Sequence, residues 1–178
     1  MLKKFFGKFK NKEAVYALYG MIVKQARRPE FYLDYGVDDS VDGRFDMILL
    51  HLFLLVYRLE EEGDDEALLQ RHLQEAFVSD MDRSLREMGV GDMNVGKQVK
   101  KMSVAWFGRA KAYRDALQSD NNQLLIEALD RNLYRDENSE FSPQIAQYMR
   151  DCSKKLHEQN IEAVKVAPAF INLVADEG

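Results

Sequence analysis

The sequence predicts an all-α fold, a single-domain helical bundle of about six helices with an extended C-terminal tail. Over most of the chain apolar residues recur every three to four positions, the spacing of helices buried on one face. Capping residues and glycines stand where these runs begin and end. The chain has 178 residues with only 3 prolines and 10 glycines, and it shows neither a βαβ alternation nor an internal repeat. One helical domain is therefore expected over residues 11–178.

A basic, aromatic segment precedes this domain. The first twelve residues, MLKKFFGKFKNK, contain five lysines and no acid, although the whole chain has a net charge of −5. Leucine and phenylalanine follow helical spacing among these lysines, which is typical of a short helix at a lipid surface. Residues 1–10 are expected to form a membrane-surface tether that uses Lys3, Lys4, Phe5, Phe6, Lys8, Phe9 and Lys10. The alternative is a frayed terminus whose aromatic side chains pack on the domain.

Two long helices are expected in the first third of the domain. Asn11 is placed to cap a helix that ends before Pro29. After an aromatic, acidic loop, Ser40 is placed to cap a second helix that ends at Gly63. Residues 45–59 of this second helix are apolar nearly all round, so it is expected to be the central element. Its apolar run is far shorter than the roughly 20 residues that a bilayer span needs.

Four further helices complete the prediction, at about residues 64–88, 93–118, 121–133 and 143–159. The helix at 93–118 has an unbroken apolar stripe at intervals of three and four. Ser142 is placed to cap the last helix, with Pro143 at its first position. Pro168 favours an extended tail lying on the bundle.

The stretch Gly91–Lys97 nearly matches a phosphate-binding loop. However, Gln98 stands where a magnesium-binding Ser or Thr belongs, and a helix rather than a strand precedes the loop. Gly89 fits a helix end that needs a left-handed residue, and Asp92 is placed to cap the next helix. Gly96 would permit close approach of another backbone. We interpret the stretch as a corner between two helices, without a nucleotide or other cofactor.

A second near-match lies in the segment DDSVDGRFD, which imitates the start of a calcium-binding loop. The position that must be a bidentate glutamate is Leu49, in the apolar run. The ordinary interpretation is that Asp39, Ser40 and Asp42 satisfy open N–H groups at the start of a buried helix.

No catalytic or metal-binding constellation is evident. The three histidines, at positions 51, 72 and 157, fall on different predicted helices. Cys152 excludes an intramolecular disulfide because it is the single cysteine, and no base can be assigned to it.

Four polar residues are expected to be structural. Asp80 lies inside an apolar stripe, so we expect it to be largely buried and paired with a cation, with Arg44 as the first choice. His51 shares a face with Arg44 and is expected to be hydrogen-bonded on the polar rim of the bundle. Asp92 is the fourth, as the cap described above.

Two regions are expected to bind a partner protein. The aromatic, acidic loop has the composition of contact hot spots, and the helix at 93–118 carries a basic face. The expected contact residues are Phe31, Tyr32, Tyr35, Asp39, Lys97, Lys100, Lys101 and Lys111.

Two segments carry a family resemblance. FYLDYGVDDSVDGRFDMILLHLFLLVYRL and FVSDMDRSLREMGVGDMNVGKQVKKMSVAWFGRAKAYRDAL resemble the ubiquinol–cytochrome c chaperone family, over roughly Ala26 to Leu117. The resemblance implies an all-helical protein that takes part in assembling the cytochrome bc1 complex. Mitochondrial members hold newly made cytochrome b at the inner membrane and near the ribosome, together with a small partner.

The resemblance therefore implies an assembly chaperone rather than an enzyme, with cytochrome b or another bc1 subunit as its client. A bacterial-type member would be cytoplasmic and peripheral on the inner face of the inner membrane. The resemblance allows contacts with the membrane surface and the ribosome without requiring them in a bacterial-type member, and no contact with DNA is expected. Two alternatives come from the residues alone. One is a small membrane-associated enzyme acting on a lipid or quinone, and the other is a structural helical subunit.

Overall fold

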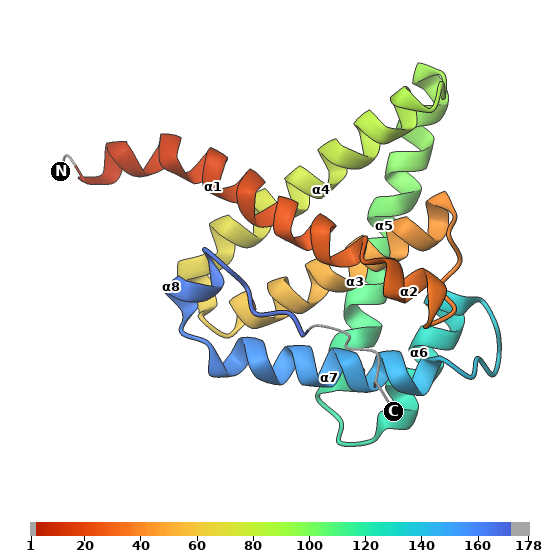
Figure 1. Cartoon of the computed structure of the whole chain (residues 1–178). Helices are drawn as coiled ribbons and strands as arrows, with labels where there is room; N and C mark the ends of the chain where they lie inside the picture. The colour runs from red at the N-terminus through yellow and green to blue at the C-terminus, as the bar shows by residue number, and fades with distance from the viewer. Residues whose placement is uncertain (1–2, 172–178) are drawn as a thin grey trace.

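The computed structural model describes residues 3–171, with side chains from residue 12 onward, and that range contains helices and turns but no strand (Figure 1). Its helices are α1 (Lys3–Ala26), α2 (Pro29–Leu33), α3 (Val41–Glu60), α4 (Ala67–Glu87), α5 (Asp92–Leu117), α6 (Asn122–Leu129), α7 (Ser142–Glu158) and α8 (Ile161–Val164). A 3₁₀ turn precedes α4 and a π turn follows α6. The all-α prediction is confirmed; the short helices α2 and α8 add to the six long ones expected.

Helix α3 is the centre of the bundle, as predicted. The N–H of Gly43 donates to Ser40 Oγ at 3.1 Å, which confirms Ser40 as the cap. Gly43 is required here, because a Cβ would lie 1.9 Å from the carbonyl oxygen of Asp38. Beyond this cap α3 is buried nearly all round, and α1, α4 and α7 pack against it.

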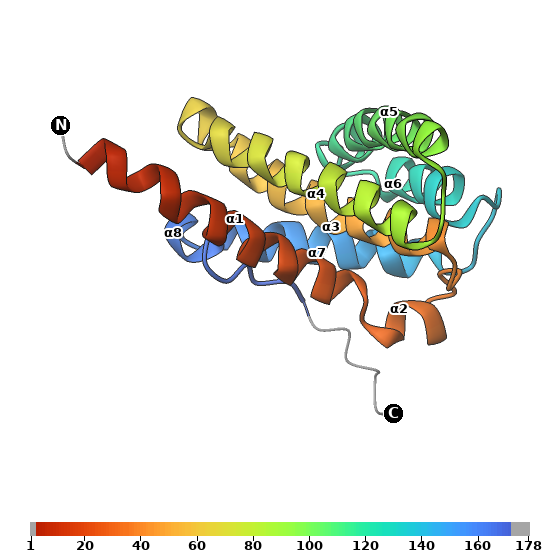
Figure 2. The ribbon, with the colours of Figure 1, turned by 90° about the horizontal axis from the view of Figure 1, so that it is seen from above.

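Helix α1 differs from the prediction at its start. It is continuous from Lys3 through Asn11, so Asn11 is inside the helix and the prediction of a cap there is wrong. Within the described side chains, the buried face of α1 begins at Val15. The first turns of α1 extend beyond the other helices in two perpendicular views (Figures 1 and 2). The prediction about the tether side chains of residues 1–10 lies outside the described side chains.

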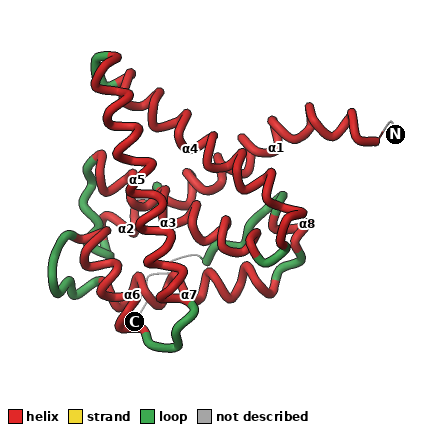
Figure 3. The backbone as a smooth tube through the Cα atoms, turned by 180° about the vertical axis from the view of Figure 1, so that it is seen from behind, coloured by secondary structure: helices red, strands yellow, loops and turns green. Residues whose placement is uncertain are grey.

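The corner between α4 and α5 lies at the end of an arm that projects from the bundle (Figures 1 and 3). Gly89 has a φ of +83°, which confirms the left-handed helix end. Gly91 is the N-cap of α5, and Asp92 is the first helical residue, so the predicted cap is wrong by one position. No atom outside its own helix lies within 4 Å of a Cβ placed on Gly96, so no backbone approaches it closely and that prediction is also wrong.

The C-terminal third closes the bundle beside α3. Helix α7 begins one residue earlier than expected: Phe141 is its N-cap and Ser142 is helical. The Ser142 hydroxyl does not cap the helix but donates a hydrogen bond to Asp130 Oδ1 at 2.5 Å. After α8 the chain lies on the bundle without regular helix, as expected, and the Gln25 side chain donates to the carbonyl of Ile171 at 3.0 Å.

Candidate functional site

The buried polar groups of the bundle are structural. His51 is fully buried rather than on the rim, which corrects the prediction. Its Nδ1 is 2.7 Å from the carbonyl of Met47, and its Nε2 is 2.7 Å from the hydroxyl of Tyr148. Burial lowers the pKa of His51 to about 4, so the ring is neutral at pH 7. Since both ring nitrogens are engaged and the site is closed, His51 orders the core and is not available for proton transfer.

Sequence reasoning missed the most buried ion pair. Asp46 on α3 accepts hydrogen bonds from Arg109 on α5 and, at 2.8 Å, from Arg135 after the π turn. Burial raises the pKa of the Asp46 carboxyl, while the two guanidinium groups oppose that shift. The signal was present in the sequence, because Asp46 is a lone carboxylate beside the apolar run of α3.

The burial of the Asp80 side chain was predicted correctly, but its ion-pair partner was not. Its side chain is 11% exposed, and it forms an ion pair with Arg83 at 2.6 Å. It also accepts a hydrogen bond from the hydroxyl of Tyr19 on α1 at 2.9 Å. The predicted partner Arg44 instead pairs with Asp39 at the surface. Asp80 itself faces Tyr19 of α1, whereas Arg44 is in the first turn of α3 beside Asp39, and this is why the predicted pairing fails.

Catalytic groups do not converge among residues 12–171. In that range no group of three His, Cys, Asp or Glu side chains could hold a metal ion. Cys152 is buried, and burial raises the pKa of its thiol, which disfavours the nucleophilic thiolate. Over the described residues no helix is long and apolar enough to cross a bilayer.

The predicted partner-binding residues do not form one surface. Phe31 is fully buried against His51 and Tyr148, so it cannot contact a partner. Tyr32 and Tyr35 are half-buried and Asp39 is exposed. The lysines belong to α5, a different element from this loop.

The basic side of α5 is exposed and uncompensated. Lys97, Lys100 and Lys101 form no ion pair with any described residue, whereas Lys111 pairs with Asp115 on the same helix. Two large apolar side chains of the same helix are also exposed: Met93, before Lys97, by 82%, and Phe107, after Lys101, by 67%. Asp92, at the start of α5, pairs with Arg86 of α4 and so fixes the corner.

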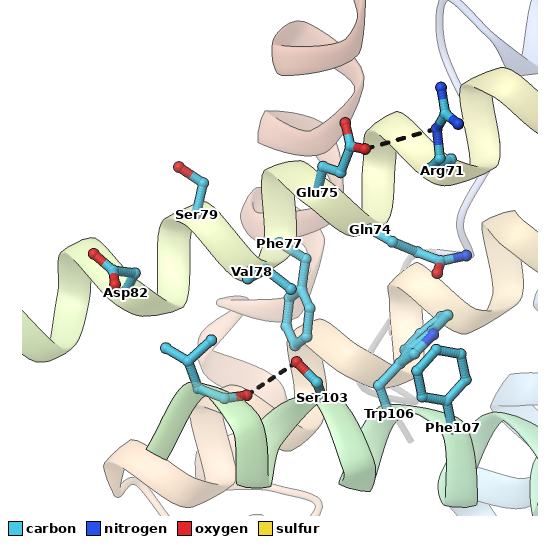
Figure 4. A pocket seen from close by; sticks show the side chains of 11 residues that line it. Arg71, Gln74, Glu75, Phe77, Val78, Ser79, Asp82, Ser103, Trp106 and Phe107 are labelled. Carbon is cyan, nitrogen blue, oxygen red and sulfur yellow. Dashed lines mark hydrogen bonds and ion pairs between the residues drawn. The ribbon is translucent and has the colours of Figure 1, made fainter. Parts of the chain in front are cut away.

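A groove runs between α4 and α5, and we call it the α4–α5 groove (Figure 4). Its volume is about 580 Å³. Phe77 and Trp106 lie at its base, and Phe107 stands at its α5 side. The lining residues are Arg71, Gln74, Glu75, Phe77, Val78, Ser79, Asp82, Val99, Ser103, Trp106 and Phe107. Sequence reasoning missed this groove, because it depends on how the two helices diverge.

Comparisons with known proteins agree on one family. Residues 33–170 match the model of the family described as ubiquinol-cytochrome C chaperone. Ubiquinol-cytochrome-c reductase complex assembly factor 1 of Xenopus laevis is 23% identical over 128 residues, which are 72% of this chain and 64% of that protein. The human factor of that description is 24% identical over 119 residues, which are 67% of this chain and 40% of that protein. The chain thus spans less than two thirds of the length of these curated relatives.

A solved structure covers nearly the whole fold. The crystal structure of the Cbp3 homolog from Brucella abortus is 33% identical in sequence. It superposes with a TM-score of 0.85 over 96% of each chain.

Proposed function

Because this chain belongs to the ubiquinol-cytochrome c chaperone family, we propose that it is an assembly factor of the cytochrome bc1 complex that binds newly made cytochrome b. The names of its relatives, which are assembly factors of ubiquinol-cytochrome c reductase, support the process. Cytochrome b as the client follows from the family resemblance. The proposal assigns no catalytic activity and no cofactor, in agreement with the description of the family as chaperones.

The observation that supports this function most is the exposed side of α5. A chaperone has to contact an incompletely assembled client, and such contacts combine large apolar side chains with charges at their edge. On α5, exposed Met93 and Phe107 stand on either side of Lys97 and Lys100 along the helix, and neither lysine forms an ion pair with a described residue. We therefore assign client contact to the basic side of α5, including Lys101 and Lys111.

The loop after α1 is a second, smaller contact in this proposal. Tyr32, Tyr35 and Asp39 remain accessible in part, and they are proposed to contact a partner. Phe31 is removed from the set, because it is an internal anchor that holds the loop on α7 through Tyr148.

Residues 1–10 are proposed to hold the protein on the inner face of the membrane. From Lys3 onward the segment begins α1, where that helix extends beyond the other helices (Figure 1). Each lysine near an anionic surface contributes about 1 kcal/mol, and less at higher salt. After deletion of residues 1–10 the protein should still give the circular dichroism spectrum of a folded helical protein. Its co-sedimentation with anionic vesicles should fall. Unchanged, salt-independent sedimentation would contradict the tether.

The function is tested in cells that lack the native copy. The level of mature cytochrome bc1 should fall, and a tagged copy of the chain should restore it. Cytochrome b should be recovered with the tagged protein from solubilised membranes. Normal bc1 levels without the chain would refute the proposed function. Restored levels without recovery of cytochrome b would instead indicate another bc1 subunit as client.

A further inference from the structure

We propose that the α4–α5 groove holds one apolar helix of the client, and that acidic residues edge this helix on the side facing α5. The proposal rests on the proposed function, since it names the binding element of the chaperone. It adds the position, the secondary structure and the charge of what is bound.

The size of the groove fits a helix. Its lining extends from Arg71 to Asp82 on α4 and from Val99 to Phe107 on α5. At 1.5 Å per residue these segments are about 16 and 12 Å long, which is the length of two to three helical turns. An amphipathic helix binds such a groove by laying its apolar face on the base and leaving its polar edges at the rims.

The base of the groove is apolar, and no other ring among the described residues packs against its aromatic wall. Phe77, Val99 and Trp106 form the base. Phe107 stands beside them and is 67% exposed, although burial of a phenylalanine side chain is favourable. A bound helix would cover this ring and the groove base together.

The charges along the two rims of the groove indicate which edge of the bound helix carries the acidic residues. On the α4 rim the charges compensate one another, since Arg71 pairs with Glu75 at 3.7 Å and Asp82 pairs with Arg86 at 2.7 Å. On the α5 side there is no acidic residue from Met93 to Arg114.

Lys100 lies seven residues before Phe107, and so on the same side of α5, and it forms no ion pair. The uncompensated charge beside the groove is therefore positive, and it complements carboxylates on the partner.

The position of Trp106 permits a direct binding measurement, because it is the single tryptophan of the chain and it lines the groove. The probe is a synthetic leucine- and alanine-rich helical peptide of about 15 residues with glutamates along its edges and a nitrotyrosine in its middle. Binding should quench the fluorescence of Trp106. A matched peptide with lysines in place of the glutamates should bind at least about fivefold more weakly.

Two substitutions test the groove and its rim separately. Phe107→Ser should weaken binding of the acidic peptide about tenfold or more, because the aromatic wall is lost. Its control is Leu33→Ser, at an apolar residue of α2 that is 79% exposed and does not line the groove. Lys100→Glu should weaken the acidic peptide and strengthen the lysine peptide. Its control is Lys155→Glu, at an exposed and unpaired lysine of α7.

Each outcome decides the proposal. It is overturned if neither peptide quenches Trp106, if Phe107→Ser and Leu33→Ser bind alike, or if Lys100→Glu leaves the peptide preference unchanged. It is also overturned if anionic vesicles change the fluorescence of Trp106 and the peptides do not, because the groove would then bind lipid. These results concern the groove alone: the proposed function stands or falls with bc1 assembly in cells lacking the native copy.

Discussion

The centre of the bundle and the basic side of α5, on the arm that α4 and α5 form, differ in whether their charged groups have partners. In the centre, Asp46 is held by two arginines and His51 has a partner at each ring nitrogen. Across the described side chains no buried nitrogen or oxygen lacks a hydrogen bond. On the arm, Lys97 and Lys100 have no ion-pair partner, and Phe107 is mostly exposed beside them.

This difference indicates that stability and partner binding are carried by separate parts of the molecule. Polar groups in the interior must be satisfied by the fold itself, because water cannot reach them. The unpaired lysines on the arm are solvated by water, so they need no partner within the fold and remain free to bind another molecule. Substitutions in the centre should therefore change unfolding, and substitutions on the arm should change binding.

The largest effect is expected for Asp46→Ala. The change leaves Arg109 without its buried partner, and removing one member of a buried pair costs about 3–5 kcal/mol in the free energy of unfolding. Urea unfolding followed by circular dichroism measures it. Asp82→Ala is the matched control, since it removes an exposed carboxylate paired with Arg86 on the arm, and its midpoint should be nearly unchanged. Equal midpoints for the two variants would contradict the comparison.

The next effect is a loss of stability in acid that depends on His51. The pKa of His51 is about 4 in the folded chain, against 6.5 for an unperturbed histidine. The unfolded state therefore binds more protons between these pH values, so stability is full above pH 6.5 and falls as the pH is lowered. About 3 kcal/mol should be lost by pH 4.

The test compares urea unfolding of the wild type and His51→Phe from pH 7.5 to 4. The variant loses the hydrogen bond to Tyr148, so it should be less stable at pH 7.5, but its stability should fall less steeply with acid. Parallel curves for the two proteins would exclude His51 as the source.

Local signals account for what could be predicted from the sequence. Ser40 and Gly89 mark helix ends because a cap or a left-handed residue acts within a few positions of the chain. The all-round apolar character of α3 predicts its central place for a similar reason. The family resemblance then supplied the function that these signals do not carry.

The features that could not be predicted depend on which helix faces pack against each other. Asp46 bonds to residues 63 and 89 positions away, a pairing that no local pattern encodes. Phe31 looks like a surface hot spot in its loop, yet packing of that loop against α7 buries it. The α4–α5 groove likewise exists only once both helices are placed.

An intermediate effect is expected for Asp80→Ala, where the two regions meet. A cost of about 3 kcal/mol would follow if a buried cation lost its partner. In the structure Arg83 is 70% exposed and water can solvate it, so the main loss is the hydrogen bond from Tyr19. We expect about 1–2 kcal/mol in urea unfolding. Asp80→Ala in a Tyr19→Phe background should cost clearly less, and an equal cost in both backgrounds would place the effect elsewhere.

The smallest effect on stability is expected for the arm itself. Lys97→Glu, Lys100→Glu and Lys101→Glu, combined in one chain, reverse three charges that form no ion pair, so the urea midpoint should stay that of the wild type. Helicity should also remain, because the three side chains point into water and leave the apolar stripe of α5 intact. In cells lacking the native copy, this variant should recover less cytochrome b and support less mature bc1 complex than the Lys155→Glu control. A stable variant that supports a normal level of the complex would show that this side of α5 does not bind the client. A variant that unfolds more easily would show instead that the arm contributes to the fold, and the separation between the two regions would be wrong.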